Sequence, residues 1–233
     1  MSVFALVHGS MHGAWCWRDL VPELERRGHQ ALVADLPCDD GNAGLAEYAA
    51  AVEAELGAAR DVVLVGHSLG GRTLPVVASH RPVSRLIFLC CVPTAPGPID
   101  PDAFSGMVTD EYATAEWLER ADGASRMAAQ SAIGIFYHDC DPQTADWAAA
   151  QLRWQGTKPL SEPSPIERWP DVPCDVILAR DDRVVRMTWA RSEALEWLEG
   201  REPILVDGSH SPFLSRPAEL ADVLALCCRE IPR

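Results

Sequence analysis

The fold of this 233-residue chain is decided by one stretch, Val62-Val63-Leu64-Val65-Gly66-His67-Ser68-Leu69-Gly70. The four consecutive apolar residues predict a buried strand, and the Gly-His-Ser-Leu-Gly sequence follows it and opens a helical pattern. A serine between two glycines at this junction fits a strand-to-helix turn tight enough to expose the serine hydroxyl. The structural alternative is a glycine-rich turn with an incidental serine. Ser68 is therefore the candidate nucleophile.

The rest of the chain repeats this alternation of short apolar runs and amphipathic helical stretches. Further strands are predicted at 3–7, 31–34, 86–89, 176–179 and 204–206, and helices at 15–27, 45–59, 188–198 and 217–229. Near-continuous apolar strands separated by helices are typical of a parallel sheet that is covered on both faces. The sequence therefore predicts an α/β fold.

The alternation stops between residues 94 and 165. This segment has no convincing strand, its entry and exit are rich in proline, and helical patterns cover about 116–135 and 143–154. We expect a helical cap at 94–165, inserted after the fourth strand into a core domain formed by 1–93 and 166–233. The alternative is a long irregular connection, but loops of this length are uncommon in compact domains.

A serine nucleophile needs a general base, and His210 is the best candidate. It follows the last predicted strand, and the carboxyl ends of parallel strands share one edge of the sheet, where ligand sites form. Of the other histidines after Ser68, His80 lies near the end of the helix that Ser68 opens, and His138 lies in the predicted cap. The alternative for His210 is a histidine on a surface loop.

The acid that orients the base is expected at the end of a strand between the serine and the histidine in the sequence. Asp181 and Asp182 both follow the strand at 176–179, and for either one the alternative is a surface ion pair with Arg183. We favour Asp182, because a carboxylate buried against His210 would fix the tautomer of the imidazole and stabilise the imidazolium.

Two backbone N–H groups are needed to hold the oxyanion. Leu69, immediately after the nucleophile, is expected to supply one. Ser10, in the loop after the first strand, is expected to supply the other, with Gly9 allowing the backbone to approach. The spacing of His8 and His12 could suggest a metal pair, but that geometry works on a helix face and this loop is interrupted by glycine.

Composition limits the classes of partner. The net charge is −14, with 20 basic residues that are scattered along the chain, so nucleic acid and membrane surfaces are poor candidates. No signal peptide is recognised at the start, and most of the eight cysteines lie in apolar stretches, which favours reduced thiols in the cytoplasm. We expect a small-molecule ester as the partner. The sequence leaves open whether the chain forms a homodimer.

Together, these residues resemble the α/β-hydrolase fold family over essentially the whole chain. The stretch His8-Gly9-Ser10-Met11-His12-Gly13-Ala14-Trp15-Cys16-Trp17 looks more particularly like the branch of plant methyl-ester esterases, hydroxynitrile lyases and their bacterial relatives. The resemblance implies a triad at Ser68, Asp182 and His210, oxyanion donors at Ser10 and Leu69, and a small helical cap over an apolar pocket. It also implies about six strands, mostly or wholly parallel. Larger members of the family begin with two further strands, whereas this sequence starts directly with the strand that leads to the Ser10 loop.

The function expected from this pattern is hydrolysis of a small or medium uncharged carboxylic ester through an acyl-enzyme on Ser68, without cofactor or metal. Four cap aromatics are candidate pocket walls or ordinary packing residues: Trp117, Phe136, Trp147 and Trp154. A hydroxynitrile lyase and a non-catalytic small-ligand receptor remain as alternatives. Ser211 follows His210 where the lyases of this branch carry a lysine, and Ser10 stands where they carry a threonine, so the esterase is favoured.

Overall fold

Six parallel strands form the central sheet of the computed structural model, which describes residues 1–98 and 101–228. They are β1 (Val3–Val7), β2 (Gln30–Ala34), β3 (Val62–His67), β4 (Arg85–Leu89), β7 (Cys174–Ala179) and β8 (Ile204–Val206), in the order β2-β1-β3-β4-β7-β8. Every neighbouring pair is parallel, so the carboxyl ends of the strands share one edge. The predicted parallel sheet of about six strands is confirmed.

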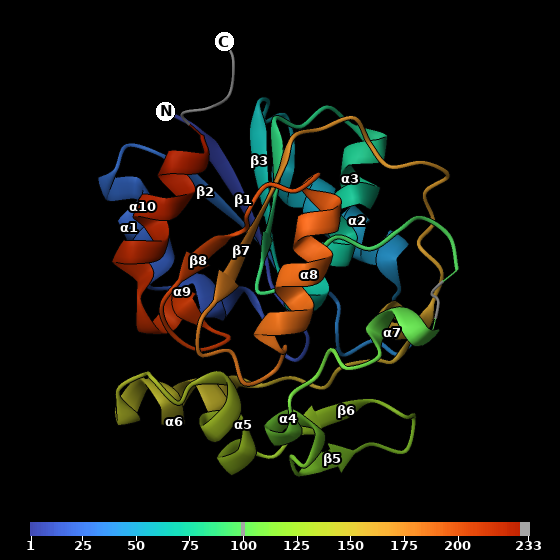
Figure 1. Cartoon of the computed structure of the whole chain (residues 1–233), viewed down its shortest axis with the longest axis vertical. Helices are drawn as coiled ribbons and strands as arrows, with labels where there is room; N and C mark the ends of the chain where they lie inside the picture. Colours follow the sequence, from blue (N-terminus) through green and yellow to red (C-terminus); the bar gives the residue numbers. More distant parts are fainter. Residues whose placement is uncertain (99–100, 229–233) are drawn as a thin grey trace.

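Helices cover both faces of this sheet. Figure 1 shows α1 (Leu20–Arg26) and α10 (Pro217–Cys227) on one side, and α2 (Leu45–Leu56), α3 (Leu74–His80) and α8 (Met187–Trp197) on the other. Every residue of β3 is buried, as expected for a strand covered on both faces. The helix predicted from residue 15 is divided into a 3-10 turn, Ala14–Trp17, and α1. The last helix ends at Cys227, and the predicted end at Arg229 lies outside the described residues.

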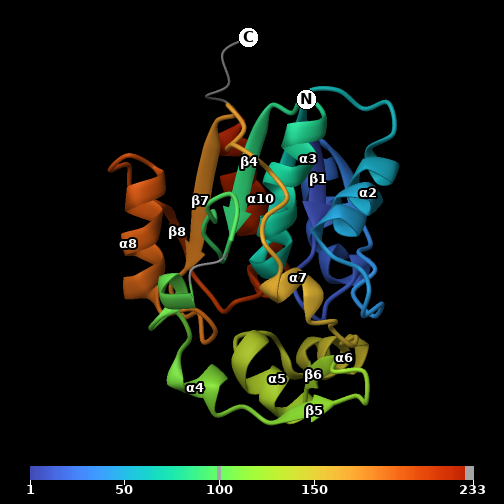
Figure 2. The same ribbon diagram turned by 90° about the vertical axis from the view of Figure 1, so that its right-hand side faces the viewer.

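The segment between β4 and β7 forms a layer beyond the carboxyl ends of the strands (Figures 1 and 2). It contains a 3-10 turn (Pro101–Phe104), α4 (Asp110–Ala113), β5 (Trp117–Glu119), β6 (Ser125–Met127), α5 (Ala129–Phe136), α6 (Pro142–Gln151) and α7 (Lys158–Ser161). This layer has the position expected of a cap, and the domain boundaries at 93/94 and 165/166 stay a prediction.

The cap is not purely helical, and the helix predicted at 116–135 is wrong in its first half. β5 and β6 pair antiparallel, with Trp117 opposite Met127 and Glu119 opposite Ser125. The turn between them includes Gly123, whose φ is 85°, a conformation that glycine adopts without steric cost. Asp122-Gly123 is a strong local turn signal that outweighs the helical spacing of the apolar residues around it. Only Ala129–Phe136 of this stretch is helical.

An arginine–aspartate ion pair is buried at the sheet edge opposite the cap. Arg85 begins β4, and its NH1 group lies 2.5 Å from Oδ2 of Asp175 in β7, with the two side chains 7% and 11% exposed. Such a pair is strongly destabilising when one partner is removed, because the other charge is left buried. All eight cysteines are free thiols. Within residues 1–98 and 101–228, no helix is long and apolar enough to cross a bilayer.

Candidate active site

The turn that carries Ser68 has the predicted strained geometry. β3 ends at His67, Ser68 begins a 3-10 helix that runs to Thr73, and the φ of Ser68 is +49°. A Cβ added to Gly66 would lie 2.8 Å from the Cα atom of Gly71, closer than side chains pack. Glycine is therefore required at 66 for the chain to turn this sharply. Ser68 stays partly exposed in a region where its neighbours are buried.

His210 and Asp182 form a buried pair at the same edge of the sheet. Nδ1 of His210 lies 2.7 Å from Oδ2 of Asp182, and the two side chains are 2% and 5% exposed. The other carboxylate oxygen accepts hydrogen bonds from the N–H groups of Val184 (2.7 Å) and Val185 (3.0 Å). A carboxylate with both oxygens occupied keeps its orientation, so the proton of the imidazole stays on Nδ1 and Nε2 is left as a base.

The two candidate aspartates are distinguished by these contacts. Asp181 is exposed, and its side chain forms no hydrogen bond with any residue in the described part of the chain. Only its backbone is engaged: the N–H donates to the carbonyl of Gly208, and the carbonyl accepts from Nε2 of His138. The structure therefore brings Asp182, and not Asp181, to His210.

Sequence reasoning missed a role for His67, the residue before the nucleophile. His67 is 1% exposed, and its Nε2 donates to the backbone carbonyl of His210 over 2.9 Å. Burial, reinforced by the charge that His210 can carry, lowers the pKa of His67 well below its ordinary value, so the ring is neutral. The strand that ends in Ser68 is thus tied directly to the loop that carries His210. Its position in the Gly66–Gly70 motif was the only available signal.

The loop after β1 brings Ser10 to the same place as Ser68. A Cβ on Gly9 would lie 2.7 Å from Nδ1 of His67 and 2.9 Å from Cβ of Ser68, so the loop backbone lies directly against the turn. Ser10 and Leu69 line one cavity together with Ser68. Leu69 is the second residue of its 3-10 helix, where N–H groups have no partner within the helix.

His8 and His12 use all of their ring nitrogens on protein partners. Nε2 of His8 accepts from the N–H of Leu36, and its Nδ1 donates to the carbonyl of Gly9. Nδ1 of His12 donates to the carbonyl of Ser10, and its Nε2 accepts from the hydroxyl of Tyr137. These bonds fix the loop after β1 and leave no ring nitrogen for a metal pair.

One group among the described residues could in principle hold a metal ion. His67, Cys90 and His210 are buried with ligand atoms within 4.8 Å of one another. One nitrogen of each histidine is already hydrogen bonded, and burial raises the pKa of the Cys90 thiol well above its ordinary value. A neutral thiol is a poor metal ligand, so the donor set does not favour a metal.

A cavity of about 530 Å³ opens in front of Ser68, of a size that suits a small organic ligand. Its walls are largely apolar and come from both the core and the cap, including Met107, Tyr112, Trp117, Leu160, Val185 and Trp189. A smaller adjoining cavity is lined by Ser10, Ser68, Phe136 and His210, among others. Ser68 therefore lines both the large cavity and the smaller cavity that His210 lines.

Two of the four candidate wall aromatics line these cavities, Trp117 and Phe136. The other two pack elsewhere. Trp147 contacts Trp15 edge-on and lies under the guanidinium of Arg18, while Trp154 is flanked by Arg120 and Arg126. Two wall residues that sequence reasoning missed are Tyr112, in the four-residue helix α4, and Trp189, in the first turn of α8, where the helical pattern does not indicate that the ring faces a cavity.

The sequence profile described as "Alpha/beta hydrolase family" matches residues 4–223. The chain belongs to the alpha/beta hydrolase family. It is 30% identical over 239 residues to a pyrethroid hydrolase of Sphingobium wenxiniae, covering 94% of this chain and 85% of that protein. It is 25% identical to methylesterase 9 of Arabidopsis thaliana over the full length of both chains.

The solved structures agree with this assignment. A crystal structure of a pyrethroid hydrolase superposes with a TM-score of 0.79 at 26% identity, covering 99% of this chain and 98% of that one. A methylesterase from Arabidopsis superposes with a TM-score of 0.81 at 21% identity, which supports the fold. The resemblance drawn from residues 8–17 and 66–70 is confirmed at the level of fold and family. These relatives are hydrolases and esterases by name.

Proposed function

We propose that this protein is a serine esterase, with Ser68 as nucleophile, His210 as general base and Asp182 as the acid that orients it. One observation carries the proposal: the buried 2.7 Å contact between His210 and Asp182 lies beside the cavity that Ser68 lines. This combination of a strained serine, a base and an oriented acid is what nucleophilic catalysis requires.

In the proposed reaction, Oγ of Ser68 attacks the ester carbonyl carbon and its proton passes to Nε2 of His210. The carbonyl π-electrons move onto oxygen, and the N–H groups of Ser10 and Leu69 stabilise that negative charge. His210 then protonates the leaving alkoxide as the ester C–O bond breaks, giving the acyl-enzyme. Water attacks the acyl group with His210 as base, and the carboxylic acid and Ser68 are released.

The substrate proposed is a small or medium carboxylic ester that is uncharged or weakly polar. The cavity volume of about 530 Å³ and its mainly apolar walls support this class. The names of the relatives, pyrethroid hydrolase and methylesterase, also support ester cleavage. A cyanohydrin lyase is disfavoured because cyanide leaves as an anion, and an uncharged Ser211 after His210 gives it no electrostatic help.

A panel of p-nitrophenyl and methyl esters, measured beside mandelonitrile, tests the proposal. We expect hydrolysis of short uncharged esters and no release of cyanide above background. The natural control is Ser68→Ala, which should lose the hydrolysis of every ester in the panel. Robust cyanide release with negligible ester hydrolysis would contradict the esterase assignment and leave the fold untouched.

A further inference from the structure

The cap holds Met11, the residue that directly follows the oxyanion donor Ser10. Met11 is 1% exposed, and its φ of +63° lies in the left-handed region that is unfavourable for a residue with a side chain. Three of its polar or sulfur atoms are bound by cap residues. Its N–H donates to Oε1 of Gln155 (3.3 Å), its carbonyl accepts from the N–H of Arg153 (2.7 Å), and its sulfur lies 3.2 Å from the N–H of Met127.

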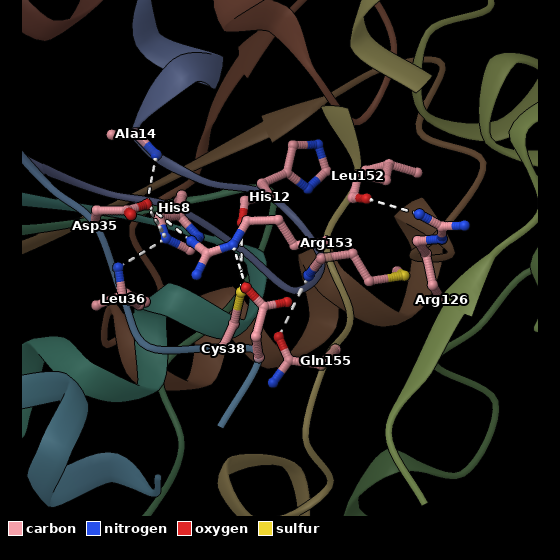
Figure 3. A network of polar contacts seen from close by, with 12 residues as sticks. His8, His12, Ala14, Asp35, Leu36, Cys38, Arg126, Leu152, Arg153 and Gln155 are labelled. Carbon is pink, nitrogen blue, oxygen red and sulfur yellow. Dashed lines mark hydrogen bonds and ion pairs between the residues drawn. The ribbon is translucent and has the colours of Figure 1, made fainter. Parts of the chain in front are cut away.

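Figure 3 shows this network from close by, with Gln155 and Arg153 from the cap facing the loop that carries His12. The side chain of Arg153 extends the attachment to the core, because its Nε and NH1 groups lie 2.8 Å and 2.9 Å from Asp39 and Asp35. Asp35 in turn accepts from the N–H of Ala14, at the far end of the same loop.

The orientation of the Gln155 amide is determined by its partners. Its Nε2 lies 2.9 Å from the carbonyl of Gly156 and 2.9 Å from the hydroxyl of Tyr48. A carbonyl can only accept, so this atom is the NH₂ group, and the amide oxygen must face the N–H of Met11. Gln155 is 1% exposed, so loss of that oxygen would leave a buried N–H without a partner.

A second contact joins the cap to the same loop at the next residue. The hydroxyl of Tyr137, at the end of α5, donates to Nε2 of His12 over 2.9 Å, while Nδ1 of His12 donates to the carbonyl of Ser10. Burial lowers the pKa of His12 to about 3, so this nitrogen remains an acceptor at neutral pH. The peptide units on both sides of Met11 are thus held by cap residues.

We propose that Gln155 is a positioning residue that holds Met11 in its left-handed conformation and so keeps the Ser10 N–H aimed at the oxyanion. The inference rests on the proposed function, because it assumes that Ser10 is an oxyanion donor. Gln155 is not among the residues that line the two cavities beside Ser68, and it acts through the backbone of Met11. The cap would then have a catalytic role besides enclosing the substrate.

The test is Gln155→Met, which keeps the length of the side chain and removes its oxygen. An oxyanion donor displaced by about 1 Å weakens transition-state binding and leaves substrate binding nearly unchanged. We expect kcat for p-nitrophenyl acetate to fall about 10- to 100-fold with KM changed less than about threefold. The inhibition constant of phenylboronic acid, which forms a tetrahedral adduct with the serine, should rise by about the same factor.

The matched control is Tyr48→Phe, which removes one partner of the Gln155 NH₂ group and leaves the bond to Met11 in place. It should lower the melting temperature while kcat stays within about twofold of wild type. If Gln155→Met does not fold, Tyr137→Phe is measured instead. It should lower kcat and boronate affinity by equal factors, and these should be smaller than those expected for Gln155→Met.

Two results would overturn the inference. One is wild-type kcat and boronate affinity in Gln155→Met, or in Tyr137→Phe where it is the variant measured. The other is a loss of kcat and boronate affinity in Tyr48→Phe that equals the loss in Gln155→Met, when the two variants have the same melting temperature. If boronate fails to inhibit the wild-type protein and no ester is hydrolysed, the proposed function itself has failed, which is a separate outcome.

Discussion

Replacing Asp182 by asparagine should reverse the hydrogen bonding of the His210 ring. Oδ1 of Asp182 accepts from two backbone N–H groups, those of Val184 and Val185, and Oδ2 accepts from Nδ1 of His210. Backbone N–H groups only donate, so the asparagine oxygen must take the Oδ1 position and its NH₂ must face His210. Nδ1 then becomes an acceptor, the ring proton moves to Nε2, and Nε2 can no longer take the proton of Ser68.

The magnitude follows from this change of tautomer. In serine triads the same substitution lowers kcat on the order of 10⁴-fold, which corresponds to about 5 kcal/mol in the activation barrier. Stability should change far less, because asparagine keeps both backbone hydrogen bonds. The loss should not exceed about 3 kcal/mol, the upper value for one hydrogen bond to a charged group.

The assay compares kcat for p-nitrophenyl acetate in wild type, Asp182→Asn and Asp181→Asn, with urea unfolding of each. Asp181→Asn is the matched control, because that side chain is exposed and forms no hydrogen bond within the described residues. It should stay within about twofold of wild type. More than a tenth of wild-type kcat in Asp182→Asn, or an equal loss in Asp181→Asn, would refute the reasoning.

Three further predictions concern the glycine that lies against the Ser68 turn, a buried histidine and the core ion pair. Gly9→Ala places a Cβ 2.7 Å from Nδ1 of the buried His67 and should lower kcat at least about 10-fold. The control is Gly134→Ala in α5, where no atom lies within 4 Å of the added Cβ, and it should raise the melting temperature by about 1–4 °C. Equal kcat in the two variants would be inconsistent with this prediction. The pKa of His12 is about 3 in the folded protein and 6.5 in the unfolded chain, so the unfolded state gains a proton first as pH falls. Below about pH 6.5, urea titrations should therefore show that wild type loses about 1.4 kcal/mol per pH unit more than His12→Gln, in which only the other buried groups, such as His67, contribute; equal slopes in the two proteins would contradict it. Asp175→Asn leaves the buried Arg85 without its counter-charge and should cost about 3–5 kcal/mol of unfolding free energy with kcat unchanged. A normal stability or a large loss of kcat would count against this account.

Local patterns were sufficient to predict the sheet and the gathering of the candidate residues at its edge. The strand at 62–65 is specified by its apolar run, and Gly66 is specified by short-range sterics, because an added Cβ would lie 2.8 Å from the Cα atom of Gly71. His210 and Asp182 could be predicted because strands in a parallel sheet end at one edge, so each residue needed only to follow a strand. The choice between Asp181 and Asp182 depended on one residue of register, and the structure gives Asp182 the contact with His210.

The contacts that join distant segments could not be predicted in this way. The hydrogen bond from His67 to His210 spans 143 residues, and that from Met11 to Gln155 spans 144. No periodicity in a single sequence encodes such pairs. In the same way, the aromatic character of Trp147 predicts burial of a large surface but does not indicate whether that surface faces a cavity or a neighbouring helix.

The central claim, that Ser68 is an activated nucleophile, is tested most directly by mass spectrometry after reaction with a fluorophosphonate. The phosphorus of the reagent is attacked by an activated serine hydroxyl and fluoride leaves, so one adduct forms per reactive serine. We expect a single adduct that maps to the peptide containing Ser68, and none in Ser68→Ala. Labelling at another serine, or an unchanged adduct in Ser68→Ala, would contradict the account.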